Sequence, residues 1–465
     1  MVLFMALLAL SIILDGLDAS IVNVALPTIS TDLNVSIGDT SWVVLTYVVV
    51  LAALLLPLSK LANNGTVKKV FLIGVVIFTV SSVICGLSTN FTTLVSFRMV
   101  QGLGAAFTTS AVTVFITKFV PANRKGIGMG VLGGASAVSI AFGPAVGGFI
   151  TSAFGWHWIF LINVPFCVAS ILLAIKILPK DEGYDKSKNP DLINSILVVA
   201  GVGAGIVCLQ NLGASHMSNT AIAACGVASV ILLITLGLRM AKHPEHLLIS
   251  PKMLKRHDFQ FLSLAFLLSG TIVMGTDYVL PYFFQICGSY SVSESGLLLS
   301  VASIFAIIFS FIVGQWCDTR GCRVPTILAG IGRIAFCLIF LVVAPRDLLL
   351  LLIALAIMGI ALAFATTGIA TALVHHAGEE DQADAATFMM ELKYTAASLG
   401  VVLYSVVFQH GLGSGTAATV SADVLESSFD LTMIFGCCLA VVILICALCV
   451  KNIVPPQKAD LEKTQ

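Results

Sequence analysis

Long apolar stretches separated by short polar connections run along the whole chain. Fourteen of them approach the ~20 residues that an α-helix needs to cross about 30 Å of hydrocarbon. None alternates as membrane β-strands do, and a backbone in lipid must satisfy its own hydrogen bonds, so each is predicted to be a helix. The predicted spans are residues 3–26, 41–59, 69–88, 92–114, 126–150, 157–178, 192–212, 219–240, 259–283, 295–316, 324–344, 348–374, 384–409 and 429–450.

The composition excludes an ordinary soluble domain. Mean hydropathy is +1.04, and 58% of residues are hydrophobic while only 10% are charged. The first stretch has no basic lead and no small-residue cleavage site, so it is predicted to be a retained helix. The 12 cysteines lie mostly within the spans without ligand spacing. They are interpreted as small core residues, and neither a disulfide nor a metal site is expected.

Basic residues are distributed unevenly among the connections. If the N-terminus is cytoplasmic, the inside loops and the C-terminal tail collect nearly every Lys and Arg outside the spans, and the outside loops hold only Arg346. This bias follows the positive-inside rule. It predicts an even number of spans with both termini in the cytoplasm.

Two hydrophilic inside stretches, 179–191 and 242–258, divide the chain. The predicted domains are an N-terminal six-helix bundle, two linker transmembrane helices with cytoplasmic loops, a C-terminal six-helix bundle and a cytoplasmic tail, over residues 1–178, 179–257, 258–450 and 451–465. The two bundles resemble each other. Pro27 and Pro281 each end the first span of a bundle, and each precedes a matching inside loop by a nearly equal number of residues. Duplicated halves are a recurrent transporter architecture, with substrate handled where they face each other.

Acidic residues stand inside the predicted spans. Asp15 and Asp18 lie three positions apart in the first span, so they share one helix face. An ionised carboxylate at membrane depth costs at least a few kcal/mol, and such residues usually face a partner or a water-filled path. The pair indicates a transport site rather than a membrane anchor.

Arg98, in the fourth span, offers a partner for Asp18. Counted from the outer ends of their spans, the two lie within roughly 5 Å in depth. Burial favours a neutral carboxylic acid and a nearby cation favours the carboxylate, so a movable Arg98 could switch Asp18 between proton uptake and release. The alternative is a static bridge that only orients the helices. Asp15 lies deeper without an obvious cation, so we expect it to be the more readily protonated acid.

The second bundle contains its own acids. Asp277 stands four residues before the proline that ends its span, as Asn23 does in the first bundle, so the repeat places it across from the first span. It is interpreted as a cation-attracting acid, or alternatively as a hydrogen-bonded helix-end residue. Glu391 in the thirteenth span lies at a depth similar to Arg333 in the eleventh. A structural ion pair between them is predicted.

Four segments resemble one known family in order and position. They are LDASIVNVALP (17–27), RMVQGLGAA (98–106), GPAVGG (143–148) and WHWIFLINVP (156–165). Together they resemble the signatures of the major facilitator superfamily, specifically of its fourteen-span drug:proton antiporters. The resemblance covers essentially the whole chain.

This resemblance implies an all-α membrane protein with two six-helix bundles and two additional transmembrane helices. It implies a secondary transporter that exports small, lipophilic cations by alternating-access antiport. The short loops favour a prokaryotic cell membrane, and a monomer is expected. The expected partners are membrane lipids, protons and a small-molecule substrate, without nucleic acid or cofactor, and the proton gradient supplies the energy. The chain shows no nucleotide-binding P-loop, nucleophile elbow or zinc signature, so an enzyme is not expected.

The expected site residues fall into three groups. Proton coupling is assigned to Asp15, Asp18 and Arg98. Substrate binding is assigned to Asp18, Asn23, Gln101, Asp277 and Glu391. Conformational change is assigned to Gly143, Pro144, Gly147 and Gly148 of GPAVGG, and to Gly314, Asp318, Arg320, Gly321 and Arg323 of the second inside-loop motif.

Each motif has a physical interpretation. Gly143 and Gly147 form a small-xxx-small pair that permits close helix approach, and Pro144 favours a bend. In the first inside loop the family's Gly, Asp, Gly and basic positions are Ser59, Asn63, Thr66 and Val67. The loop has therefore lost its acid, and latching of the halves is expected to depend on the second copy.

Two alternatives to drug export remain open. The same fold could export an endogenous metabolite, a lipid precursor, a siderophore or a peptide, because fold alone does not name a substrate. A transport-inactive membrane sensor is the alternative from another class. The excess of embedded acids over embedded bases favours a cationic substrate.

Overall fold

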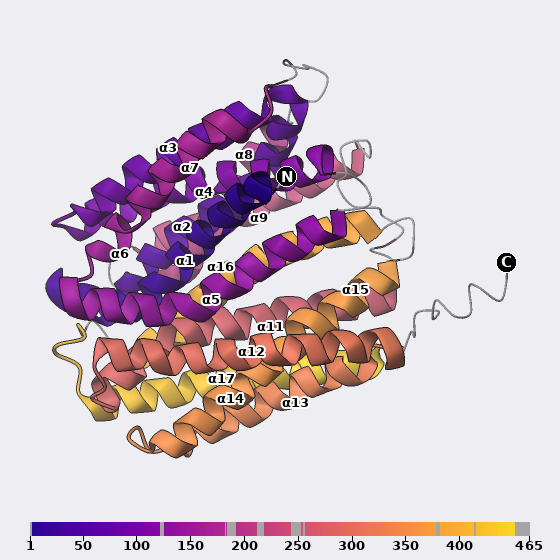
Figure 1. Ribbon diagram of the computed structural model, residues 1–465. Coiled ribbons are helices and arrows are strands. Elements are labelled where there is room, and N and C mark those ends of the chain that lie inside the picture. Colours follow the sequence, from indigo (N-terminus) through magenta and orange to yellow (C-terminus); the bar gives the residue numbers. More distant parts are fainter. Residues whose placement is uncertain are drawn as a thin grey trace. The chain divides into compact units, whose positions relative to one another are not determined.

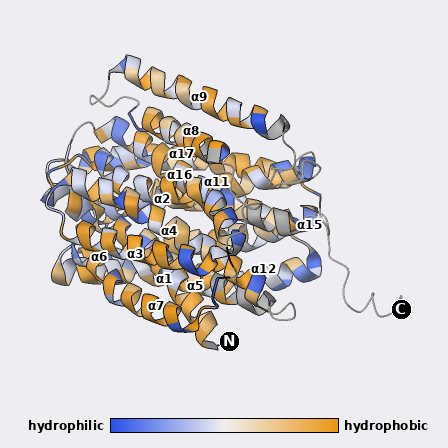
Figure 2. Ribbon diagram, turned by 90° about the horizontal axis from the view of Figure 1, so that it is seen from above, coloured by the Kyte–Doolittle hydropathy of each residue, from blue (hydrophilic) through white to orange (hydrophobic). Residues whose placement is uncertain are grey.

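The computed structural model describes residues 2–120, 125–181, 183, 192–211, 218–242, 253, 256–377, 382–412 and 415–451. Every regular element in these ranges is a helix. Within the described residues, thirteen helices are long and apolar enough to cross a membrane, and the shorter apolar segment Val199–Gln210 adds a further candidate. Hydrophobic residues dominate these helices, and hydrophilic ones gather towards their ends (Figure 2). The predicted all-helical membrane fold is confirmed.

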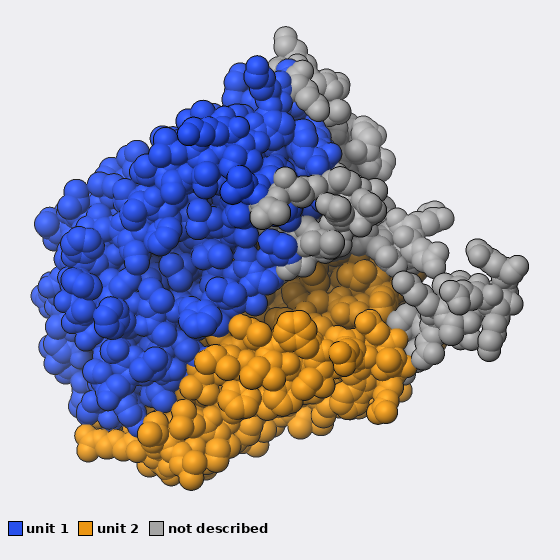
Figure 3. Space-filling model, viewed as in Figure 1, with its two compact units in different colours: residues 1–246, 284–300, 412–421 blue, residues 247–283, 301–411, 422–465 orange. Residues whose placement is uncertain are grey.

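Close contacts divide the chain into two compact units (Figure 3). Unit 1 contains residues 1–246, 284–300 and 412–421, and unit 2 contains residues 247–283, 301–411 and 422–465. The two linker helices thus group with the first six spans. Short pieces of the later chain also belong to unit 1, so these units do not follow the segment borders expected from the sequence.

Unit 1 is built around the helices of the first bundle (Figure 1). Within it α1 packs against α5, α4 packs against both α2 and α3, and α8 packs against α9 and α2. The elements are α1 (Val2–Asp32), α2 (Ile37–Leu61), the π-helical turn η1 (Ala62–Thr66), α3 (Val67–Gly86), α4 (Phe91–Phe119), α5 (Lys125–Phe154), α6 (Trp158–Leu161), α7 (Asn163–Ile177), α8 (Leu192–Gln210) and α9 (Asn219–Lys242).

Unit 2 holds most of the second bundle. Within it α13 packs against α14 and α17, and α11 packs against α17. Three elements of this part of the chain include residues that group with unit 1, namely η5 from Phe284 onward, α12 up to Ser300 and α16 at Leu412. The elements are α11 (His257–Tyr282), the π-helical turn η5 (Phe283–Cys287), α12 (Val292–Arg320), α13 (Arg323–Phe340), α14 (Leu348–Ala363), the π-helical turn η6 (Phe364–Ile369), α15 (Ala370–Ala377), α16 (Gln382–Leu412) and α17 (Ala422–Cys449).

Polar side chains mark where several helices begin. Ser36 accepts the backbone N–H of Asp39 at 3.1 Å and so caps α2. Asn90 caps α4 by accepting the N–H of Thr93 at 2.8 Å, and Asp347 caps α14 in the same way. These caps satisfy backbone donors that a helix end leaves free.

The helices are less regular than the hydropathy pattern predicts. The predicted span 157–178 is divided into α6 and α7, and the predicted span 348–374 contains η6 and the start of α15. Between α2 and α3 the chain turns at Gly65, whose φ of +98° suits glycine. A Cβ there would also collide with the carbonyl oxygen of Gly183. Hydropathy locates spans but does not register such local changes of helical geometry.

Candidate functional site

A buried ion pair joins α1 to α4. Arg98 donates from Nη1 to Asp18 Oδ2 at 2.5 Å, and both side chains are 0% exposed. The predicted agreement in depth is therefore confirmed. Two opposite charges in the interior of a helical bundle are tolerated because each supplies the partner that water would otherwise provide.

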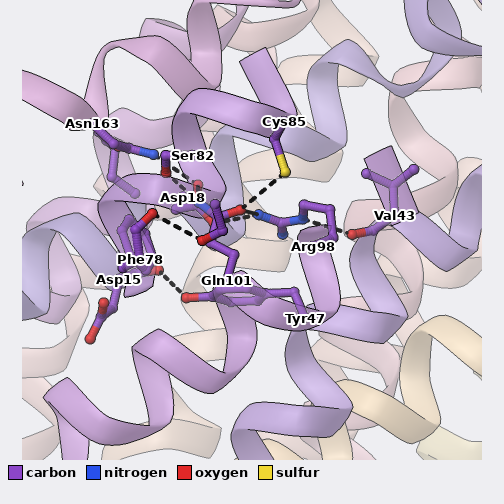
Figure 4. A network of polar contacts seen from close by, with 12 residues as sticks. Asp15, Asp18, Val43, Tyr47, Phe78, Ser82, Cys85, Arg98, Gln101 and Asn163 are labelled. Atoms are coloured by element: carbon purple, nitrogen blue, oxygen red, sulfur yellow. Dashed lines mark hydrogen bonds and ion pairs between the residues drawn. The ribbon is translucent and has the colours of Figure 1, made fainter. Parts of the chain in front are cut away.

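Neutral amides complete the surroundings of the carboxylate (Figure 4). Asp18 Oδ1 accepts from Gln101 Nε2 and from Asn163 Nδ2, each at 2.9 Å. Gln101 also donates to Ser82 Oγ at 2.7 Å and accepts from Arg98 Nη1 at 2.8 Å. Residues from α4 and α7 thus donate to the Asp18 carboxylate of α1, and Ser82 of α3 accepts a hydrogen bond from Gln101. Because the Gln101 amide is fully buried and occupied, its position favours a role inside this network over contact with substrate.

Residues of α2 and α6 contact Arg98 on its other sides. Its Nε donates to the carbonyl oxygen of Val43 at 2.9 Å. Its guanidinium carbon lies 4.3 Å from the centre of the Tyr47 ring and 5.6 Å from that of Phe160. Such cation–π contacts stabilise a desolvated guanidinium. Nη2 has no hydrogen-bond partner, so its two N–H groups remain for a different arrangement.

Asp15 has different surroundings from Asp18. It is half-buried, and its carboxylate accepts from Thr109 Oγ1 at 2.8 Å and from Thr108 Oγ1 at 3.2 Å. No cation of the described residues forms an ion pair with it. One acid of the pair is therefore neutralised by a cation, while the other is held only by hydroxyl groups.

Four members of these networks were not assigned from the sequence: Ser82, Thr108, Thr109 and Asn163. A signal existed for Asn163, because it lies within the WHWIFLINVP segment. The two threonines also had one, because they lie two and three residues after the end of RMVQGLGAA. Ser82 carries no such signal. Its role depends on the packing of α3 against α4, which the sequence does not specify.

The GPAVGG segment packs α5 tightly against α1. A Cβ added at Gly143 would collide with Ser20, and one added at Gly147 would lie 2.7 Å from the carbonyl oxygen of Ile21. Gly148 faces the first turn of α12, where its added Cβ would lie 3.2 Å from the Cα of Gly296. The close approach expected of these glycines is present within unit 1. Their role in antiport, and that of Pro144, stays a prediction.

The first inside loop obtains an acid from another part of the chain. Asp181 accepts the backbone N–H of Lys68 at 2.8 Å and that of Lys69 at 3.3 Å. It therefore caps the N-terminus of α3, where the helix dipole favours a negative charge. The loop motif itself lacks an acid, and Asp181, from the stretch after α7, places one at the start of α3. The motif alone did not predict this contact.

The second inside-loop motif keeps its acid. Asp318 is exposed near the end of α12, and Gly321 has a φ of +82° in the turn to α13. Arg323 donates to the carbonyl oxygen of Leu448 at 3.2 Å. Gly314 and Arg320 lie on α12. The predicted latch between the halves stays a prediction.

The predicted ion pair between Glu391 and Arg333 is wrong. Arg333 is fully buried, and none of its three guanidinium nitrogens has a hydrogen-bond partner. Glu391 is half-buried, and its Oε1 lacks a partner as well. The ionisable groups that act on the charge of Arg333 are Cys337, Tyr404 and Asp277. Similar depth on two helices does not ensure that the side chains point towards each other.

The remaining predicted substrate residues lie in separate places. Asn23 in α1 is 8% exposed, and its Oδ1 has no hydrogen-bond partner. Asp277 is half-buried in α11. The structure therefore brings Asp15, Asp18, Gln101 and Arg98 together in unit 1, and Asp277 and Glu391 belong to unit 2.

Known proteins resemble this chain over most of its length. The family model described as Major Facilitator Superfamily matches residues 8–401. The riboflavin transporter RibZ of Clostridioides difficile is 26% identical over 407 residues, which cover 87% of this chain and 88% of that protein. The putative multidrug resistance protein MdtD of Citrobacter koseri is 29% identical over 343 residues, covering 73% and 71% of the two chains.

A solved structure resembles the fold. The crystal structure of a bacterial homologue of the human lysosomal transporter Spinster, inward-facing and unoccupied, matches with a TM-score of 0.66 at 16% identity. The match covers 97% of this chain and 98% of that one. At this identity the likeness shows the fold alone.

Proposed function

The chain belongs to the Major Facilitator Superfamily, and we propose that it exports small, lipophilic cations in exchange for protons. Family membership makes it a multi-pass transporter of the cell membrane rather than an enzyme. What we propose beyond this is that protons drive the export and that the substrate is a lipophilic cation. It depends on the buried acids of α1 and on the relatives that are named for multidrug resistance.

The observation that carries the proposal is the contrast between Asp15 and Asp18. Asp18 accepts from three donors, one of them the Arg98 guanidinium, with no exposure. Asp15 is half-buried and accepts only from hydroxyl groups. A proton can bind Asp15 without separating an ion pair, whereas protonation of Asp18 must release Arg98. Two neighbouring acids with different environments are suited to successive proton transfers.

The proposed cycle uses this difference. Protons from the outside neutralise Asp15 and then Asp18, and Arg98 leaves its carboxylate for another acceptor. A cationic substrate loses its attraction to the neutralised acids and is released outwards. Release of the protons to the cytoplasm restores the ion pair and the affinity for a new substrate. A proton or a substrate can shift the transporter between its two states only if it binds one state more tightly than the other.

Substrate contacts are proposed for groups outside the buried ion pair. Asp15 is the acid of α1 available to a cation, since Asp18 is enclosed. Asn23, on the same helix, has a carbonyl oxygen without a hydrogen-bond partner, but this atom is buried, so its proposed contact with substrate requires a change of conformation. In unit 2, Glu391 is a half-buried carboxylate whose Oε1 is buried without a partner, and it is proposed as a separate cation contact.

Export of an uncharged, flavin-like metabolite is the second candidate. It is favoured by the coverage of the match to the riboflavin transporter RibZ, which extends over 87% of this chain. A neutral substrate would use the same proton-driven change of state but would not compete with protons for a carboxylate.

Inside-out membrane vesicles distinguish the candidates. Vesicles containing the protein and matched vesicles without it are energised by respiration and supplied with ethidium or riboflavin. The proposal expects ethidium uptake that collapses when a protonophore is added. Riboflavin uptake without ethidium uptake would favour the second candidate. Failure to move either compound would contradict cation export and favour a sensor or another substrate.

A further inference from the structure

Unit 2 contains a cation without a partner. Arg333, in the middle of α13, is 0% exposed, and its Nε, Nη1 and Nη2 all lack hydrogen-bond partners. Arginine keeps its charge in proteins, so it cannot escape the cost of burial by losing a proton. Arg98 shows how unit 1 meets the same cost, with an aspartate, a glutamine and a backbone carbonyl oxygen. An unpaired arginine inside a membrane bundle therefore requires an acceptor in some state of the protein.

Among the described residues, one carboxylate acts electrostatically on Arg333. Cys337 stands one turn along the same helix, Tyr404 comes from α16, and Asp277 comes from α11. The polar ends of Cys337 and Tyr404 gather at Gly436 of α17, where an added Cβ would lie 3.2 Å from Sγ. The Tyr404 hydroxyl lacks a partner too. Of these groups, only Asp277 supplies an anion by ordinary ionisation near neutral pH.

We infer that Asp277 is the counter-ion of Arg333, in a pair that is open in the conformation described and closed in another state of the transport cycle. That transport cycle is the one of the proposed function, on which this inference rests. The residues act on each other electrostatically but do not form an ion pair here. Asp277 is half-buried, whereas Arg333 is fully enclosed. Ionised Asp277 attracts the guanidinium, and neutral Asp277 releases it.

Glu391 provides a matched control. It is also an embedded, half-buried carboxylate of unit 2, with a free oxygen. It is not among the groups that act on the charge of Arg333. Neutralising Glu391 therefore removes a comparable acid without removing a counter-ion.

The pair is tested by unfolding, which requires no substrate. The midpoint of thermal unfolding is measured in lipid nanodiscs for wild type, Asp277→Asn, Arg333→Gln and the double variant. Asp277→Asn should lower the midpoint by about 3 °C or more when Arg333 is present. In the Arg333→Gln background the same change should have little effect, because no buried cation remains to be neutralised. An equal shift in both backgrounds would overturn the inference.

Two further variants examine the charge itself. Asp277→Glu keeps a carboxylate and should preserve the dependence on Arg333, whereas Glu391→Gln should shift the midpoint equally in both backgrounds. Proton-driven ethidium efflux should fall about tenfold in Asp277→Asn and recover in Asp277→Glu. Efflux that is unchanged in Asp277→Asn would contradict a pair that opens and closes during transport. Ethidium inactivity of the wild type would instead contradict the proposed function and leave the unfolding result valid.

Discussion

Asp18→Asn removes one charge from the buried network and leaves its partner in place. Asp18 accepts hydrogen bonds from Arg98, Gln101 and Asn163 at 2.5, 2.9 and 2.9 Å. An asparagine retains one acceptor oxygen, but its amide group would direct N–H donors at a guanidinium that also donates. Arg98 would then be buried without an anion. Breaking a buried pair in this way costs about 3–5 kcal/mol.

The neighbouring acid supplies the control. Asp15 accepts only from the hydroxyls of Thr108 and Thr109. A hydroxyl can either donate or accept, so it adapts to an amide, and Asp15→Asn should cost about 1 kcal/mol or less. Both substitutions lie on one face of α1. The difference between their losses in free energy of unfolding therefore measures the ion pair and not a general change in α1.

The assay is reversible unfolding in mixed detergent micelles, followed by tryptophan fluorescence. Asp18→Asn, Arg98→Gln and the double variant complete a thermodynamic cycle with wild type. The double variant should lose less stability than the two single variants together, by about 2 kcal/mol or more. Additive losses, or an Asp18→Asn variant as stable as Asp15→Asn, would refute the account of this network.

Three further predictions concern helix packing, the first inside loop and the geometry of the cation. Gly147→Ala places a Cβ 2.7 Å from a backbone oxygen of α1, so it should lower the free energy of unfolding by about 1–3 kcal/mol. The control is Gly134→Ala on the same helix, whose Cβ meets nothing within 4 Å and should not destabilise the protein. Asp181→Ala removes the cap of α3 and should cost about 0.5–2 kcal/mol. Hydrogen exchange in the first turn of α3 should become faster, and unchanged exchange there would argue against the cap. Arg98→Lys keeps the charge but cannot reach Asp18, Gln101 and the Val43 carbonyl together, so ethidium efflux should fall about tenfold in vesicles; normal efflux would show that charge alone suffices.

Features that depend on local pattern were predictable from the sequence. The hydropathy of each stretch located the helices, because helix length and lipid thickness are related by a fixed rise per residue. The same rise placed Asp18 and Arg98 at one depth, and they do form an ion pair. The small side chains of GPAVGG indicated a close helix contact, which is present between α5 and α1.

The sequence did not predict features that depend on how the helices are oriented towards one another. Ser82 and Asn163 join the network only because α3 and α7 pack beside α4 and α1. Asp181 reaches the start of α3 from a stretch more than a hundred residues later in the chain. Depth alone paired Arg333 with Glu391, although the side chains do not meet. A single sequence therefore predicts how deep in the membrane a residue lies better than it predicts where its side chain points.

The central claim is that proton movement is coupled to export through Asp18. Its most direct test is efflux of ethidium from proteoliposomes under an imposed pH gradient, with simultaneous measurement of proton flux, for wild type and Asp18→Asn. The account predicts gradient-dependent efflux with opposing proton movement in wild type, and loss of that coupling in Asp18→Asn. Coupled efflux that persists unchanged in Asp18→Asn would contradict it.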